Sequence, residues 1–130
     1  MLNLDTHIVV SLLNGDLSKI EHQLVAGDSL AISDIVLWEL AKLVQLRRLE
    51  LDFDDAAFAV FLRSVTVFPV TMEIARKSTE LDFASDPANE VIAATSIVEN
   101  IPLLTRDRRI LRSKLVPFAP ARPSRPRTRR

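Results

Sequence analysis

Short apolar runs alternate with longer amphipathic stretches along most of the chain, which predicts strands alternating with helices. The apolar runs are short enough to be buried strands, and a turn or a helical pattern follows each of the first four. Strands are expected at Met1–Asp5, Ser29–Ser33, Thr66–Val70 and Ile101–Thr105, with a possible fifth at Leu115–Phe118. This alternation favours a parallel sheet covered by helices on both faces.

The stretches between these strands repeat apolar residues at helical spacing. Helices are expected at Thr6–Leu13, Leu17–Ala26, Asp34–Leu49, Asp54–Ser64 and Thr71–Leu81, then from the Asp86–Asn89 turn through Val98, with a last helical turn through Leu111. Asn14-Gly15 is a strong turn signal, and Ser18 and Gly27 suit the start and the end of the second helix. The pattern therefore indicates a single α/β domain.

Size and composition agree with one domain. At 130 residues, 48% of them hydrophobic, the chain can bury one core and is too short for a second. Cys is absent, which excludes disulfides and thiolate metal sites and agrees with a reducing compartment. No apolar run is long enough to span a bilayer and the start lacks a basic signal-peptide region, so we expect a cytoplasmic protein without a membrane segment.

The net charge is zero, but it is unevenly distributed along the chain. The last ten residues carry five Arg and no acid, so residues 1–120 hold 12 basic and 17 acidic groups. Pro, Ser and Arg dominate residues 120–130, and we predict a disordered basic tail there, after a domain that covers residues 1–119. The tail is either a solubilising extension or cloning remnant, or an arm that attracts nucleic acid.

Two acidic residues follow predicted strands: Asp5 closes the first, and Asp107 lies two residues beyond the fourth. In parallel sheets, ligands bind beyond the carboxyl ends of the strands, near the point where strand order reverses. Taken singly, an Asp at a strand end is more often a helix cap or a turn former. Glu39 is less ordinary because it lies in an apolar helical segment, where a carboxylate is costly to bury without a partner. It either binds a ligand or reaches water from the edge of the buried stripe.

Three segments together resemble the PIN-domain family, in particular the VapC ribonuclease toxins of bacterial toxin–antitoxin pairs. They are LNLDTHIVV, ISDIVLWELAKLVQLRRLELD and SDPANEVIAATSIVENIPLLTRDRRI, and the resemblance extends from residue 1 to about residue 118. It implies a PIN-like domain with a doubly wound sheet of about five mainly parallel strands flanked by helices. It also implies a metal-dependent endoribonuclease that uses Mg²⁺ or Mn²⁺, is neutralised by a cognate VapB-like antitoxin and forms homodimers.

By position, the acidic residues of the family fall on Asp5, Glu39 and Asp107, which the resemblance implies as catalytic metal ligands. Thr105 belongs to the family's Thr-x-Asp phrase and supplies a hydroxyl that could orient a ligand or a water, and Thr6 is expected as a second supporting hydroxyl. Several carboxylates suit this chemistry because hard Mg²⁺ takes oxygen ligands and their charge offsets its dehydration.

The remaining family acid is the second Asp of an Asp-Pro-x-Asp phrase, and here that position is Asn89. An amide oxygen can coordinate but brings no charge, so metal binding and cleavage should be weaker. Either this is natural variation, in which Asp86 completes the metal shell, or it is an Asp-to-Asn change made to silence a toxin. The alternative function is therefore a catalytically impaired PIN-fold protein that binds an antitoxin or RNA without cutting.

Basic side chains crowd around Asp107. They are Arg106, Arg108, Arg109 and Arg112. We expect them to bind the RNA backbone, which the acids alone would repel, although a solvated helix face is the plainer interpretation.

Two further residues have competing interpretations. For Trp38, the only Trp in the chain, core packing is the default. The alternative is that it lines a groove where the antitoxin of such toxins inserts. His7 follows Asp5 closely, but we expect a structural role because the family reaction uses metal-bound water.

Overall fold

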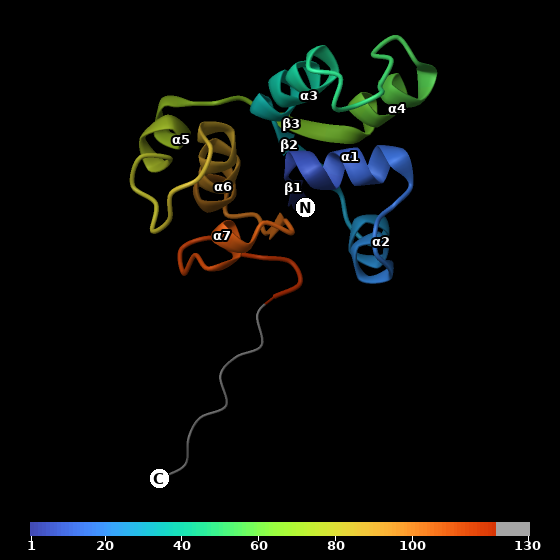
Figure 1. The fold of residues 1–130 in the computed structure, drawn as a ribbon. Helices are drawn as coiled ribbons and strands as arrows, with labels where there is room; N and C mark the ends of the chain where they lie inside the picture. Colours follow the sequence, from blue (N-terminus) through green and yellow to red (C-terminus); the bar gives the residue numbers. More distant parts are fainter. Residues whose placement is uncertain (122–130) are drawn as a thin grey trace.

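The computed structural model describes residues 1–121, and it shows a parallel sheet with helices on both sides (Figure 1). The strands are β1 (Leu2–Leu4), β2 (Leu30–Ser33), β3 (Val65–Phe68) and β4 (Leu103–Leu104). They lie in the order β3-β2-β1-β4, and all neighbours are parallel. This confirms the predicted doubly wound α/β fold. Residues 122–130, which make up most of the predicted basic tail, lie outside the described range.

The expected fifth strand is reduced to one parallel bridge, between Leu103 and Phe118. Its two backbone hydrogen bonds run from the Leu103 N–H to the Pro117 carbonyl and from the Ala119 N–H to the Leu103 carbonyl. Residue 117 would donate the next hydrogen bond of this ladder, and because proline has no N–H, Pro117 ends the ladder on that side.

The helices are α1 (Thr6–Asn14), α2 (Lys19–Ala26), α3 (Ile35–Gln45), α4 (Ala56–Ser64), α5 (Met72–Lys77), α6 (Pro87–Glu99) and α7 (Arg108–Leu111). Two of them end earlier than predicted. Helix α3 stops before Arg47, which has a left-handed φ of 57°. Helix α5 ends at Lys77, and beyond it the hydroxyls of Ser78 and Thr79 donate to the carbonyls of Ala75 and Arg76, competing with the backbone for the last acceptors.

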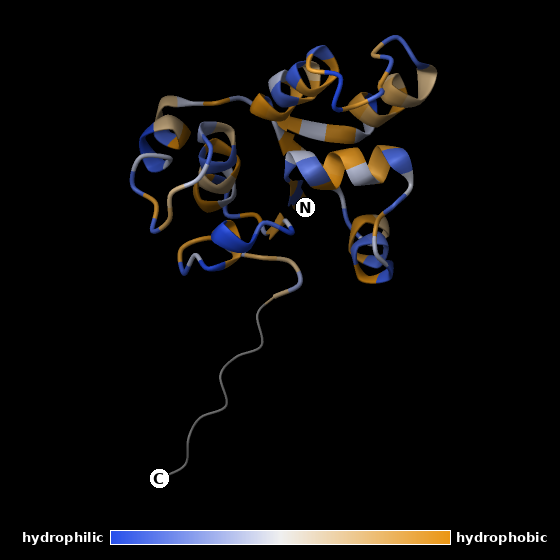
Figure 2. Ribbon diagram, viewed as in Figure 1, coloured by the Kyte–Doolittle hydropathy of each residue, from blue (hydrophilic) through white to orange (hydrophobic). Residues whose placement is uncertain are grey.

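The core lies on both sides of β1. Leu2 and Leu4 are buried with apolar residues of α1, whereas the Asn3 amide donates to the Ile92 carbonyl (3.2 Å) and to the Ser96 hydroxyl (2.9 Å) of α6. Alternate residues of a strand point to opposite faces, so β1 is covered by α1 on one side and by α6 on the other, as Figure 1 shows. In α7 the first two residues are Arg and the last two are Ile and Leu, so only the start of this helix is hydrophilic (Figure 2).

The strand order places a topological switch point beside β1. The chain runs from β1 to β2 and β3 in one direction, then crosses to β4 on the other side of β1. The carboxyl ends of β1 and β4 therefore border the crevice where ligands bind in sheets of this kind. Asp5 follows β1, and Thr105 follows β4. Among residues 1–121, no helix is long and apolar enough to cross a membrane.

Candidate acidic site at the switch point of the sheet

A hollow of about 300 Å³ opens at the carboxyl ends of β1 and β4. We call it the acidic hollow, and it is lined by Asp5, His7, Val10, Ser11, Arg106 and Asp107. Residues a hundred positions apart meet here because parallel pairing of β1 with β4 brings their ends to the same edge of the sheet. Two of the three acids predicted as metal ligands therefore share one cavity.

Asp5 is held rigidly at this edge. It is only 2% exposed and caps α1, with one carboxylate oxygen accepting from the Ile8 N–H (2.9 Å) and the other from the Thr105 hydroxyl. Burial raises the pKa of Asp5 above its usual range. The hydrogen bonds from Thr105 and Ile8 lower this pKa in part, whereas the negative charge of Asp107 raises it. The fold thus keeps a carboxylate where its charge is poorly solvated.

Asp107 is linked to Asp5 through Thr105. The Asp107 N–H donates to the Thr105 hydroxyl (3.0 Å), and that hydroxyl donates to Asp5. The Asp107 carboxylate caps α7, accepting from the N–H groups of Arg109 (2.8 Å) and Ile110 (3.3 Å). Both acids are thus helix caps, but the shared hollow sets them apart from ordinary caps.

Glu39 reaches the same region from α3. Its carboxylate accepts a hydrogen bond from the hydroxyl of Thr6, the residue after Asp5, and Thr6 is itself buried. Glu39 is half-buried, so it is neither a solvated charge at the edge of the helix nor an unpaired charge in the core. Thr6 thus ties Glu39 to the end of β1, and Thr105 ties Asp5 to the end of β4.

The donor set fits a hard divalent cation in kind, because carboxylate and hydroxyl oxygens are the ligands that Mg²⁺ and Mn²⁺ prefer. A cation beside Asp5 would also offset both its burial and the repulsion from Asp107. Within residues 1–121, however, no three acidic or histidine side chains lie together in an arrangement that could hold an ion. Asp107 and Glu39 are partly exposed, whereas Asp5 is buried.

Asn89 and Asp86 lie outside the lining of the acidic hollow. Asn89 is in the first turn of α6, and its amide donates to the Ser85 hydroxyl (3.2 Å). Ile92 of α6 accepts the hydrogen bond of Asn3, so these two residues mark one level of the fold. Asn89 lies about 4.5 Å before Ile92 along the helix, and Asp5 lies about 6.6 Å after Asn3 along the strand. Because α6 runs opposite to β1, both displacements point toward the carboxyl end of β1. Asn89 is therefore at roughly the level of Asp5, on the α6 face. Asp86 is exposed at the N-cap of α6, where its side chain makes no capping hydrogen bond.

The four Arg residues predicted to bind RNA have different environments. Arg108, Arg109 and Arg112 are exposed on and just after α7. Arg106 lies at the hollow and is bound to Glu21 of α2, with Nε–Oε2 and Nη2–Oε1 distances of 2.7 and 2.6 Å, while its Nη1 donates to the Ser11 hydroxyl (3.1 Å). Three members of the cluster are thus solvated, and one is fixed.

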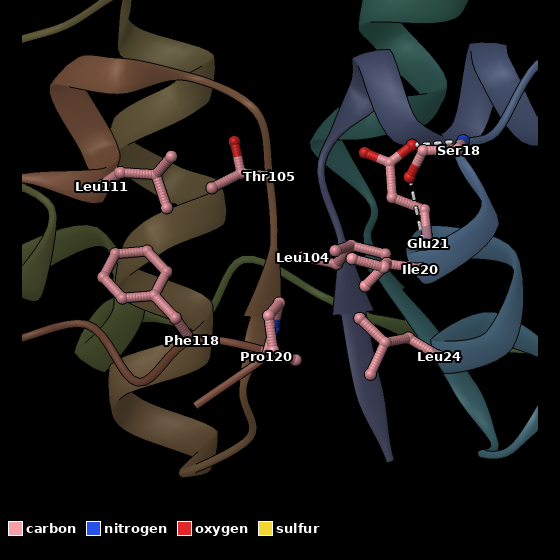
Figure 3. A pocket seen from close by; sticks show the side chains of 10 residues that line it. Ser18, Ile20, Glu21, Leu24, Leu104, Thr105, Leu111, Phe118 and Pro120 are labelled. Carbon is pink, nitrogen blue, oxygen red and sulfur yellow. Dashed lines mark hydrogen bonds between the residues drawn. The ribbon is translucent and has the colours of Figure 1, made fainter. Parts of the chain in front are cut away.

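Sequence reasoning missed Glu21 and Ser11 as neighbours of the site. The Ser18-x-x-Glu21 spacing does signal a helix start, and a capping box forms there, but nothing in the sequence pairs Glu21 with Arg106. Glu21 and Thr105 also line a second cavity of about 380 Å³, between α2 and the C-terminal part of the domain (Figure 3). The Trp38 prediction was wrong in its default form, since Trp38 is 54% exposed on α3.

The chain is similar to known proteins in sequence and in fold. The family model of the PIN domain matches residues 3–114. A comparison with curated proteins gave no match.

Three solved structures have a similar fold. They are a toxin–antitoxin complex from Klebsiella pneumoniae, VapBC2 from Rickettsia felis bound to a DNA fragment from their promoter, and FitAcB from Neisseria gonorrhoeae. In that order, the identities are 18, 21 and 18%, and the TM-scores are 0.67, 0.69 and 0.67. The alignments cover 86, 91 and 92% of this chain and 91, 97 and 98% of those chains. PIN domains are generally nucleases, and because the family model spans nearly the whole described structure, this chain belongs to the PIN domain family.

Proposed function

We propose that this protein is a metal-dependent endoribonuclease that acts as the toxin of a toxin–antitoxin pair. The observation that carries the proposal is the meeting of Asp5, Thr105 and Asp107 at the switch point of the sheet, in a chain of the PIN family. The toxin assignment is supported by three structures of similar fold, one of which is a toxin–antitoxin complex by name and another VapBC2.

In this proposal Asp5, Glu39 and Asp107 hold Mg²⁺ or Mn²⁺, and Asn89 or Asp86 completes the ligand set. The ion, when bound, would activate a water and stabilise the leaving oxygen. The residues of the chain supply the rest: the hydroxyls of Thr105 and Thr6 orient Asp5 and Glu39. The two less buried acids, Glu39 and Asp107, would have to change rotamer to reach an ion beside Asp5.

The RNA backbone would approach from the α7 side, where four Arg residues counter the repulsion between phosphates and the acids. Each phosphate contact releases counterions, so RNA binding should weaken steeply as salt is raised.

A cognate antitoxin is the proposed protein partner, and its proposed docking place is a groove between α3 and α4. The groove has a volume of about 380 Å³ and an apolar lining of Leu37, Ala41, Phe53, Phe58 and Leu62. Trp38 is exposed on the same helix α3. A helix that inserts apolar side chains would cover this surface. We also propose that the chain forms a homodimer and acts in the cytoplasm, where cellular RNA is accessible.

Asn89 favours one alternative: a PIN-fold protein that has lost most of its cutting activity and binds an antitoxin or RNA. The two functions are separated by incubating a panel of cellular RNAs with the protein in Mg²⁺, Mn²⁺ or EDTA. The variants Asp5→Ala and Asn89→Asp are tested beside it. We expect cleavage in Mn²⁺ by the protein, faster cleavage by Asn89→Asp and none by Asp5→Ala or in EDTA. Cutting by Asn89→Asp alone would favour the alternative, and no cutting by any variant would refute the nuclease proposal.

A further inference from the structure

The contacts of Arg106 point to a role for Glu21 that the nuclease site by itself does not require. Glu21 lies in the first turn of α2, 85 positions before Arg106, yet its carboxylate is the partner of this Arg, which lines the acidic hollow. We infer that Glu21 is a positioning residue: it holds the Arg106 guanidinium at the rim of the acidic hollow so that the remaining N–H groups meet an RNA phosphate. This inference rests on the proposed RNA-cutting function.

The ion pair is well shielded on the Glu21 side. The Glu21 side chain is 12% exposed, against 45% for Arg106, and its carboxylate accepts both Arg106 bonds and the Ser18 N–H (2.9 Å). The hydrogen bond from Arg106 lowers the pKa of Glu21 to about 2. Glu21 therefore stays ionised at any physiological pH, and the bidentate geometry fixes the plane of the guanidinium.

The arrangement leaves part of Arg106 available for a ligand. A guanidinium has five N–H groups, and the contacts to Glu21 and Ser11 use three of them within the described residues. Ser11 and Arg106 both line the acidic hollow, and Arg106 directly precedes Asp107. A planar donor that is bound to a carboxylate along one edge can offer its other edge to phosphate oxygens.

A positioning role and a purely neutralising role for Glu21 predict opposite changes in RNA affinity when Glu21 is removed. If Glu21 only cancelled the charge of Arg106, its removal would leave one more positive charge beside the hollow, and RNA would bind more tightly. If Glu21 fixes the guanidinium, its removal frees a long side chain that must be ordered again on binding, and RNA binds less tightly. The direction of the change therefore separates the two roles.

The chain offers a matched pair of variants at the same helix start. Gln at position 21 can still accept the Ser18 N–H in a capping box, so Glu21→Gln removes the ion pair with Arg106 while keeping the helix cap. Ser18→Ala removes half of the capping box and leaves the Arg106 contacts untouched. A loss of helix stability can thus be distinguished from a loss of Arg106 position.

The test measures the affinity of each variant for short fluorescein-labelled RNAs of mixed sequence, in EDTA, by fluorescence anisotropy. We expect Glu21→Gln and Arg106→Ala each to weaken binding about tenfold, or about 1.4 kcal/mol. The double variant should be no weaker than Arg106→Ala, because Glu21 acts only through Arg106. Ser18→Ala should melt at a lower temperature and bind RNA like the wild type.

Three outcomes would overturn the inference. Equal or tighter binding by Glu21→Gln would show that Glu21 merely neutralises Arg106. Independent, multiplying losses in the double variant would show that Glu21 does not act through Arg106. If the wild type itself does not bind the RNAs, the proposed RNA function fails, and the positioning role fails with it.

Discussion

We expect the buried carboxylate of Asp5 to lower the stability of the fold. The substitution Asp5→Asn measures this loss of stability. Asn keeps an oxygen to accept the Ile8 N–H, and Asp and Asn are about equally good helix N-caps. The raised pKa of Asp5 means that its surroundings favour the neutral form over the carboxylate. A neutral side chain of the same shape should therefore stabilise the metal-free protein at neutral pH.

The magnitude follows from two opposing terms. Asn has only one acceptor oxygen, so the Thr105 hydroxyl then faces the amide NH2, and the loss of its bond to the carboxylate costs about 1.5 to 3 kcal/mol. Removing a poorly solvated charge, with the repulsion from Asp107, returns several kcal/mol. We expect a net gain of about 1 to 2 kcal/mol, or a rise in Tm of about 3 to 8 °C for a domain of this size.

The pH dependence has a defined sign. Because the folded pKa of Asp5 is raised above its ordinary value of 3.8, Asp5 contributes stability only when it is protonated. That contribution is complete below the unfolded pKa and is lost as pH rises through the folded pKa. The advantage of Asp5→Asn should thus be largest where Asp5 is ionised in the folded protein, and it should shrink as the pH falls through the folded pKa toward 3.8.

The assay is thermal unfolding followed by circular dichroism, in EDTA and then in Mn²⁺. Mn²⁺ at ten times its Kd should stabilise the wild type by about 1.4 kcal/mol and leave Asp5→Asn unchanged. Asp55→Asn is the matched control, since Asp55 caps α4 from an exposed position and should give little change in either condition. A fall in the Tm of Asp5→Asn in EDTA would refute the reasoning, as would an equal response of both proteins to Mn²⁺.

Three further substitutions probe the site and its partner. Asn89→Asp should raise Mn²⁺ affinity and cleavage rate at least several-fold, measured by titration calorimetry and RNA cleavage, because it restores a carboxylate at about the level of Asp5; equal values would remove Asn89 from the site. Thr6→Val should lower the cleavage rate about tenfold with little change in fold, because Glu39 loses its orienting hydroxyl, and an unchanged rate would make that contact incidental. Trp38→Ala should leave the Tm within about 2 °C of wild type but weaken antitoxin capture at least tenfold, and a large fall in Tm would show a core role instead.

The candidate site combines helix capping with the ligand role that we propose for its acids. Asp5 and Asp107 each cap the helix that follows a strand end, so the same hydrogen bonds that start α1 and α7 also aim the carboxylates. Thr105 joins them by donating to Asp5 and accepting from the Asp107 backbone. An acid at such a position is ordinary by itself, and only its meeting with a second acid in one hollow makes it a candidate ligand.

The main elements of the fold and the position of two acids at strand ends follow from the sequence alone. The apolar runs and helical spacing predicted four strands, the helices between them and the parallel arrangement, because these patterns reflect which faces must be buried. Asp5 and Asp107 could be placed at strand ends from the sequence, since a parallel sheet brings such ends to one edge. The early ends of α3 and α5 were missed because left-handed backbone at Arg47 and the hydroxyl contacts after Lys77 leave only weak sequence signals.

Only the tertiary structure decided which distant side chains meet. The pairing of β1 with β4 brought Thr105 onto Asp5, and the packing of α2 against the turn after β4 gave Arg106 its partner Glu21. Trp38 was expected in the core because of its residue type, yet the packing leaves it exposed on α3. Such contacts depend on how whole elements are placed in space, and hydrophobic periodicity carries no information about polar partners separated by 85 or 100 positions.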